Sequence, residues 1–390
     1  MSTVGVRERT GNTLPVLVAA LSLVYAIAGL AWLLGAGGYA FGPVPPDGER
    51  LSLLAQVPKE VGAGLIAVVG ILGVPAATGH TRTEWSASAY RPLLVFTALQ
   101  VVVFGLLAPT VTVVILSGYL LVLVGLPAGI VWLVVGAWRQ PATRVLLLAV
   151  AVVVVAVEVT TGLFDWAAFR EVAGGIAGVP AKVGTTPLFV SGAFLLGCGW
   201  ALLGVRGLRS VRGRCLRCGR PGANWTRPES ARRWGFWATI VAVLCPMPYA
   251  LLRMTWLLPN PIGFDADELN AEPGMKLFGL GLGLIALASG IVTLGLIRPW
   301  GEVWPRWIPF VAGRPVPIKA AVIPGAVAAT LLLVSSASLI GLLWSSDAST
   351  AENILFLLIL PFPVWGAAVA LATAAYYYRR RTTCTACLQG

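Results

Sequence analysis

Two pairs of cysteines are the residues in this sequence whose type and spacing most clearly point to chemistry. The chain contains Cys215-Leu216-Arg217-Cys218-Gly219 near its middle and Cys384-Thr385-Ala386-Cys387 further on. A C-x-x-C pair supplies two thiolates from one tight turn, and two such pairs make a closed tetrahedral site of the structural zinc type. Gly219 permits the backbone turn that such a knuckle needs. The spacing therefore predicts a zinc site formed by Cys215, Cys218, Cys384 and Cys387.

This zinc is expected to be structural, because four thiolates leave no open position at which water could bind. A rubredoxin-like iron, an iron–sulfur site and thiols without a metal are the alternatives. The two remaining cysteines, Cys198 and Cys245, lie inside apolar runs. We interpret them as small packing residues.

The composition indicates that lipid covers most of the protein. Hydrophobic residues make up 57% of the 390 residues, charged residues only 11%, and the mean hydropathy is +0.84. A soluble domain is typically about 25% charged, so this chain lacks the charge to cover a water-exposed surface. The formal net charge of +12 is spread over short basic clusters between apolar runs. This placement is typical of membrane-insertion signals and argues against a nucleic-acid partner.

Long apolar stretches predict the helices that must position the cysteines. A helix needs about 20 apolar residues to cross the hydrocarbon core of a bilayer. The apolar block from Pro92 to Trp138 is about twice that length, and Pro109 offers a turn at which it divides. We expect an all-α membrane protein with about ten transmembrane helices. The expected ranges are 13–35, 60–78, two spans within 92–138, 144–163, 187–205, 235–258, 277–297, 320–344 and 354–378.

The distribution of charge predicts the orientation of these spans. With both termini in the cytoplasm, most arginines fall in inward-facing connections, including the basic loop from Arg206 to Arg233, while acids such as Asp265 and Asp267 fall outside. Both cysteine pairs are then cytoplasmic, in a reducing compartment that disfavours disulfides. The basic loop is interpreted as an orientation signal resting on anionic lipid headgroups, or alternatively as a docking platform for a cytoplasmic protein.

Three polar residues within the expected spans are candidates for function. Ionisable groups inside a membrane are costly and mark functional positions. Glu158 and Arg253 are expected toward the outer leaflet, where they form either a structural ion pair or part of a substrate or proton pathway. Gln100 is a further polar candidate within the third span.

An internal repeat relates the two halves of the chain. Tyr25 and Trp32 recur at the same spacing as Tyr249 and Trp256, and the segment 64–67 (Gly-Leu-Ile-Ala) recurs at 283–286. This predicts a parallel 4+2+4 arrangement, which occurs in some transporter folds. The expected parts are a first four-helix block (1–140), two central helices (141–205), the basic loop (206–234), a second four-helix block (235–380) and a tail with C-x-x-C (381–390).

The motifs favour transport over catalysis. His80 is the only histidine, and the sequence contains no phosphate-binding G-x-x-x-x-G-K, no H-E-x-x-H and no G-x-S-x-G. We therefore expect no enzyme. The predicted function is that of a secondary permease or the membrane subunit of a transport complex; the alternative is a non-catalytic scaffold that recruits a cytoplasmic partner.

One resemblance accompanies these motifs. The tandem four-helix blocks, the segment Trp304-Pro305-Arg306-Trp307-Ile308-Pro309 and the C-x-x-C elements resemble polytopic membrane proteins of actinobacterial genomes. That resemblance implies a multi-pass membrane fold and no assigned activity.

Overall fold

The computed structural model describes most of the chain as helix. The described residues are 13–43, 52–81, 87–109, 121–138, 186–215, 218–220, 223–271, 273–306, 311–344, 349–384 and 387, with scattered positions between 144 and 174. Every regular element in these ranges is a helix, and the single isolated β-bridge there joins Val303 and Pro315. The prediction of an all-α protein is confirmed for this part of the chain.

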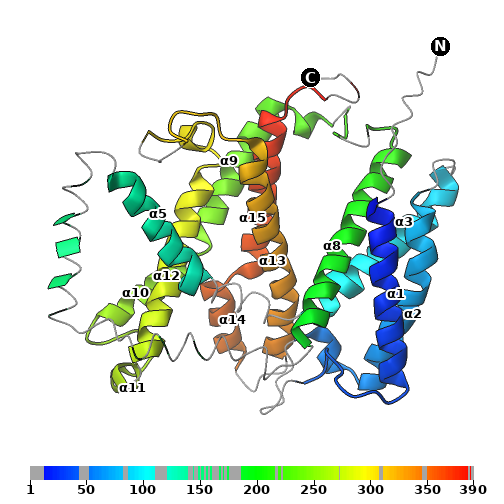
Figure 1. Ribbon diagram of the computed structural model, residues 1–390, viewed down its shortest axis with the longest axis horizontal. Helices are drawn as coiled ribbons and strands as arrows, with labels where there is room; N and C mark the ends of the chain where they lie inside the picture. Colours follow the sequence, from blue (N-terminus) through cyan, green and yellow to red (C-terminus); the bar gives the residue numbers. More distant parts are fainter. Residues whose placement is uncertain are drawn as a thin grey trace.

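One group of helices, here called bundle one, lies at the right of Figure 1. Small residues bring α1 and α2 together: a Cβ added at Gly29 would lie 2.6 Å from the backbone nitrogen of Ala67, and one at Gly70 would lie 2.6 Å from that of Ala26. Such contacts are how helices associate where lipid offers no hydrophobic driving force. The members of bundle one are α1 (Thr13–Leu33), α2 (Lys59–Gly79), α3 (Ala87–Val102) with the π-helical turn η2 (Val103–Leu107), and α8 (Thr186–Val211).

A second group, here called bundle two, contains the later helices. Prolines divide two of its candidate membrane spans: α9 gives way to α10 at Pro246, and α14 gives way to α15 at Pro361. Proline cannot donate the backbone hydrogen bond that a continuous helix needs. Bundle two consists of α9 (Pro228–Leu244), α10 (Met247–Met254), α12 (Pro273–Leu294), α13 (Ile318–Trp344), α14 (Thr350–Ile359) and α15 (Phe362–Arg380).

Eight helical segments of the described chain are long and apolar enough to cross a membrane. They match the expected first, second, third, sixth, seventh, eighth, ninth and tenth spans, although the seventh begins earlier than expected, at Pro228 rather than Gly235. The fourth expected span is described only from Leu121, within η3 (Leu121–Gly125) and α5 (Leu126–Trp138), and the fifth only at scattered positions. The count of ten therefore stays a prediction.

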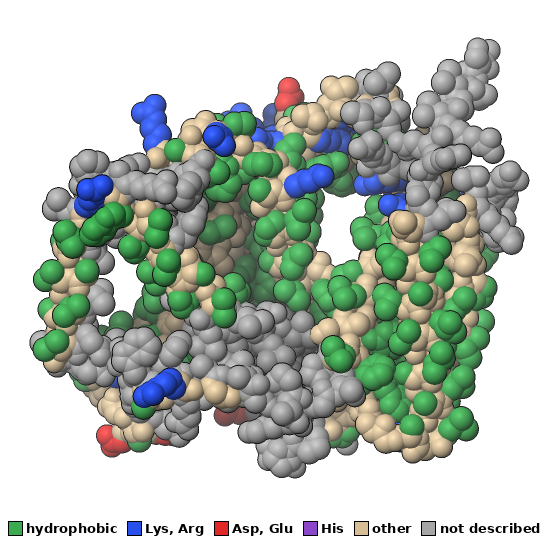
Figure 2. Space-filling model, viewed as in Figure 1, with side chains coloured by type: hydrophobic (Ala, Val, Ile, Leu, Met, Phe, Trp, Pro, Cys, Tyr) green, Lys and Arg blue, Asp and Glu red, His purple; other side chains and the backbone are tan. Residues whose placement is uncertain are grey.

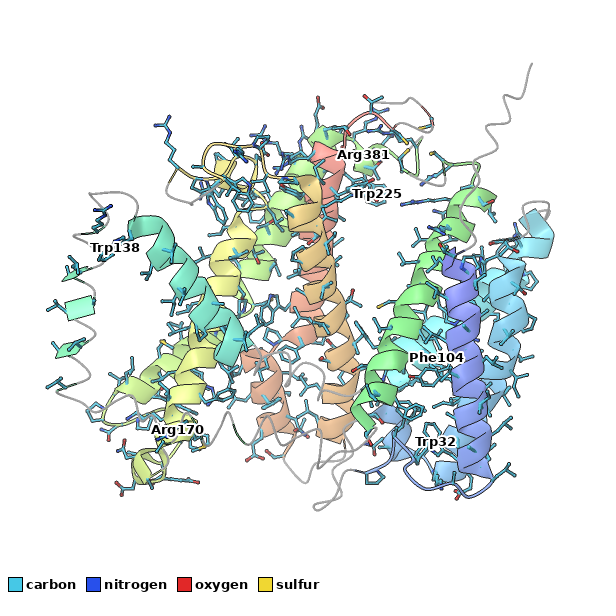
Figure 3. The ribbon with its side chains drawn as sticks, viewed as in Figure 1. Trp32, Phe104, Trp138, Arg170, Trp225 and Arg381 are labelled. Carbon is cyan, nitrogen blue, oxygen red and sulfur yellow. The ribbon has the colours of Figure 1, made fainter. Side chains whose placement is uncertain are left out.

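The side surface and the two ends of the molecule differ in chemistry. Apolar side chains cover the lateral face of bundle one in Figure 2, while lysine and arginine gather mainly at one end. Figure 3 places Arg381 and Trp225 at that end, here called the cysteine end, and Trp32 at the opposite end. The start of α1 and the end of α15 both lie at the cysteine end (Figure 1). Exposed side chains such as Leu188 (74%) and Val159 (80%) belong on a surface that faces lipid rather than water.

The two bundles pack within themselves more than against each other. The most extensive helix contacts are α1 with α2 and α3 with α8 in bundle one, and α15 with α9 and α13 in bundle two. Between the bundles, α13 contacts η2 and the short turn η1 (Leu53–Gln56), which follows the opposite end of α1. Figure 2 shows an opening between the bundles on the cysteine-end side of this contact.

The two segments that suggested a repeat share a local contact. The ring of Trp32 packs edge-on against Phe41 with centroids 5.9 Å apart, and the ring of Trp256 packs the same way against Phe264 at 5.1 Å. Both tryptophans are buried. The repeat and the domain boundaries stay predictions, because the fourth and fifth expected spans lie largely outside the described residues.

Candidate metal centre

The first cysteine pair lies in a tight knuckle directly after α8. The backbone N–H of Gly219 donates to the carbonyl of Cys215 at 2.7 Å, and the N–H of Cys215 donates to the carbonyl of Arg220 at 2.8 Å. Gly219 has a φ of +76°, a left-handed conformation that residues with a Cβ rarely adopt. These bonds turn the chain back on itself, so both sulfurs can face the same point.

The second cysteine pair follows the last turn of α15. The helix ends at Arg380, and Cys384 is buried four positions later. Two arginines fix this segment: Arg381 donates through Nη2 to the carbonyl of Thr226 at 3.3 Å, and Arg220 donates through Nη1 to the carbonyl of Thr382 at 3.3 Å. Arg220 is itself buried, at 7% exposure. It therefore ties the first knuckle to the residues that lead into the second.

The structure brings the four predicted ligands together. The Sγ atoms of Cys215, Cys218, Cys384 and Cys387 all lie within 4.8 Å of one another, and those of Cys218 and Cys387 are 3.5 Å apart. All four are free thiols rather than disulfides. The prediction that these cysteines form one cluster is confirmed. The two pairs come from distant parts of the sequence, and the fold brings them together.

The geometry of the cluster fits a single metal ion. Zinc–sulfur bonds of about 2.3 Å place the corners of a tetrahedron about 3.8 Å apart. The observed separations, from 3.5 Å to at most 4.8 Å, reach that value with small side-chain adjustments. Cys218 and Cys384 are buried, and Cys215 and Cys387 are half-buried. A closed and partly dry site of this kind suits a structural ion.

The electrostatics of the cluster also favour a cation. Burial, with hydrogen bonds among the neighbouring thiols, raises the pKa of Cys218 to about 12. Because a metal binds the thiolate form, binding at this site is coupled to loss of the Cys218 proton. The guanidinium of Arg220 lies beside the knuckles, where its positive charge offsets the excess negative charge of four thiolates around a divalent ion.

Arg253 lies at the opposite end of bundle two, in the last turn of α10. Its guanidinium carbon is 4.1 Å from the ring centroid of Trp256, and its Nε donates to the hydroxyl of Tyr249 at 3.1 Å. A cation at the carbonyl end of a helix also interacts favourably with the helix dipole. Its predicted partner, Glu158, lies outside the described residues, so the ion pair stays a prediction.

Gln100 lies in the interior of bundle one. The side chain is fully buried, and its Nε2 donates to the carbonyl of Val69 at 2.7 Å. The Oε1 atom has no hydrogen-bond partner among the described residues. Gln100 thus links α3 to α2, and it does not meet Arg253, which belongs to the other bundle.

A small polar network at the cysteine end of bundle one escaped the sequence reasoning. The Nδ1 of His80 and the hydroxyl of Tyr90 lie 2.6 Å apart, and the Nε2 of His80 lies 2.9 Å from the hydroxyl of Thr97. Burial lowers the pKa of His80 to about 4, so the imidazole is neutral at pH 7. The only sequence signal was a lone histidine beside an apolar run.

The four-cysteine cluster is thus the candidate site that both the sequence and the geometry support. No family model, curated protein or solved structure matches this chain. Its function is therefore argued from the arrangement of its own residues.

Proposed function

We propose that this chain is a multi-pass protein of the cytoplasmic membrane with both termini and the four-cysteine site in the cytoplasm. The support is the distribution of charge between the two ends. Arginines follow α8 and α15 and precede α9 at the cysteine end, whereas Asp265, Asp267 and Glu268 lie in the connection at the opposite end. Basic connections remain on the cytoplasmic side during insertion.

Zinc is the ion that we assign to the four-cysteine site. Cytoplasmic thiols stay reduced, which removes disulfides as a competing use of the cysteines. Separations of 4.8 Å or less suit one ion, whereas an iron–sulfur cluster needs room for several irons and sulfides between the thiolates. A single iron has the same ligand preference for sulfur, and metal analysis distinguishes it from zinc.

The activity that we propose is transport, as a secondary permease or as the membrane subunit of a transport complex. The observation that carries this proposal is the division into two separately packed bundles, which contact each other through α13 and are linked again by the four cysteines. Many transporters work by rocking one bundle against another around a central site. A structural ion between α8 and α15 would set how far the bundles part at the cytoplasmic end.

A scaffold is the second candidate function, favoured by one specific observation. The segment beside the knuckles exposes Trp225 at 53%, where it packs against Tyr378 with ring centroids 5.4 Å apart. Arg381 lies over the Tyr378 ring at 5.1 Å. Aromatic and arginine side chains are enriched where proteins bind each other, so this surface suits a cytoplasmic partner.

Uptake by reconstituted protein separates a permease from a scaffold. Liposomes containing the purified protein are incubated with an isotope-labelled extract of small metabolites, and their contents are compared with those of empty liposomes by mass spectrometry. A permease enriches specific solutes, and Glu158→Gln or Arg253→Gln abolishes the enrichment while the protein still inserts. A scaffold gives no enrichment. It keeps its bound partner in Glu158→Gln and Arg253→Gln, but loses that partner when Cys215 or Cys218 becomes serine.

Native mass spectrometry in mild detergent tests the metal independently of transport. The expected result is one zinc per chain, lost from Cys218→Ser and Cys387→Ser. The matched control is Cys198→Ser, which removes a thiol from α8 outside the cluster and is expected to keep the zinc. Reduced, intact protein without any metal would rule out the four-cysteine site.

A further inference from the structure

A cavity at the cysteine end of bundle two lies apart from the metal centre. Its volume is about 440 Å³, within the range of small-molecule sites. Three arginines from different elements line it: Arg232 from α9, Arg298 from the turn after α12, and Arg379 from α15. Two glutamates, Glu229 and Glu302, complete its charged lining.

The charge of this cavity matches a singly charged anion. Glu302 is paired with Arg379, whose Nη2 lies 3.2 Å from the carboxylate. Arg232 and Arg298 then face the single carboxylate of Glu229, which leaves one net positive charge in the lining. The Nε–H of Arg379 is buried and has no acceptor among the described residues, whereas Arg232 and Arg298 are exposed and are the donors that a ligand in the cavity can reach.

The walls of the cavity are held in place by contacts that do not involve a ligand. Arg379 donates through Nη2 to the carbonyl of Leu296 at 2.7 Å. The hydroxyl of Tyr376 donates to the carbonyl of Gly301 at 2.7 Å. A Cβ added at Gly301 would lie 1.7 Å from the carbonyl oxygen of Gly295, so the turn around Arg298 is closely folded. The end of α15 and the turn are therefore preformed, so a ligand would need to order mainly the exposed side chains of Arg232 and Arg298.

The level of the cavity relative to the ends of the helices indicates the source of the anion. Its lining residues stand where three candidate spans begin or end: at Pro228, just after Leu294 and at Arg379. The ends of membrane-crossing helices lie at the level of the lipid headgroups. Basic pockets between helices on the cytoplasmic side are known to bind anionic headgroups.

We propose that this cavity binds the phosphodiester headgroup of an anionic phospholipid, with Arg232 and Arg298 contacting the phosphate. A phosphodiester carries one negative charge, which equals the net positive charge of the lining. The bound lipid would join the beginning of α9 to the turn after α12 from the membrane side. This inference depends on the membrane orientation proposed above and not on transport.

The lipids that the purified protein retains test this proposal directly. The purified protein is supplied with phosphatidylglycerol and phosphatidylcholine in equal amounts, and the lipids that remain bound are identified by native mass spectrometry. We expect selective retention of phosphatidylglycerol. The double variant Arg232→Gln/Arg298→Gln should lose about 30-fold of that selectivity, because each basic residue near an anionic headgroup contributes about fivefold.

The matched control removes two arginines from the same end of the protein but outside the cavity. Arg233 neighbours Arg232 in α9, Arg314 precedes α13, and both are exposed. We expect Arg233→Gln/Arg314→Gln to keep its preference within about threefold, because distant surface charges are screened. One zinc per chain in both double variants shows that each has folded, and Arg298→Lys, which keeps the charge, is expected to retain part of the preference.

Three results would overturn the proposal. Equal retention of both lipids by the unaltered protein would show that the cavity does not select an anion. Equal losses in the two double variants would assign the preference to the general basic surface. Displacement of phosphatidylglycerol by millimolar inorganic phosphate would assign the cavity to a soluble phosphate rather than to a lipid.

Discussion

Removing the metal should loosen the cysteine knuckles without unfolding either bundle. The first knuckle contains two backbone hydrogen bonds, from Cys215 to Arg220 and from Gly219 to Cys215, and we expect these to be what holds it once the metal is removed. At about 1 kcal/mol each, the two bonds contribute about 2 kcal/mol to the free energy of opening the knuckle. Because about 1.4 kcal/mol corresponds to a factor of ten, this slows amide exchange about 30-fold. A structural zinc contributes about 10–16 kcal/mol in zinc-finger peptides, so the loaded site should slow exchange by more than about 1,000-fold.

Hydrogen–deuterium exchange with mass spectrometry checks this on protein in detergent, before and after treatment with a chelator and a thiol reductant. Peptides covering 212–220 and 381–387 should gain deuterium much faster after treatment. Peptides from α1 should not change, because the α1–α2 contact relies on Gly29 and Gly70 and not on the metal. Unchanged exchange of the knuckles would refute the reasoning, as would loss of protection throughout both bundles.

Three further predictions concern single positions. Gly219→Ala should weaken zinc retention about tenfold in a chelator titration, because a residue with a Cβ in the left-handed backbone conformation costs about 1–2 kcal/mol. The control is Gly213→Ala, which also has a left-handed φ (+59°) but lies outside the knuckle and should retain the metal. Gly29→Ala should lower the melting temperature by separating α1 from α2 at a cost of about 1–3 kcal/mol, whereas Gly64→Ala, whose Cβ would lie 3.9 Å from its nearest neighbour, should not. The melting temperature should also fall as pH drops from about 6.5 toward 4. In that window unfolded His80 binds a proton, while folded His80, whose pKa is lowered to about 4, does not. A pH dependence of the melting temperature that persists in His80→Gln would contradict this.

The helices and the cysteine cluster were predictable because they depend on local signals. Apolar runs of about 20 residues identify spans, and the C-x-x-C spacing identifies a knuckle before any contact is known. The breaks at Pro246 and Pro361 likewise follow from residues that cannot continue a helix. The spans and breaks each follow from one short segment, and the cysteine cluster follows from two short segments that repeat the same spacing.

The features that the sequence did not predict depend on contacts between distant segments. Arg220 gave no sign in its neighbourhood that it would bond to Thr382, and the cavity lined by Arg232, Arg298 and Arg379 is assembled from three separate helix ends. The start of α9 was placed too late, at Gly235, because the basic residues that precede it resemble a loop. Proline at the first helical position has a fixed φ that suits a helix start, and Pro228 was the overlooked signal.

The position of the two cysteine pairs along the chain also imposes an order on biosynthesis. Cys215 and Cys218 follow α8, while Cys384 and Cys387 follow α15, so a ribosome exposes the first pair well before the second. At about 5–20 residues per second, the interval is roughly 10 to 30 s. In the orientation proposed above, the first two thiols are exposed to the cytoplasm during that time with only half of the proposed ligand set. Closure of the site therefore marks the moment at which the helices of bundle two have been inserted, and a chain whose later helices misinsert would carry an open cysteine pair that proteases and chaperones can recognise.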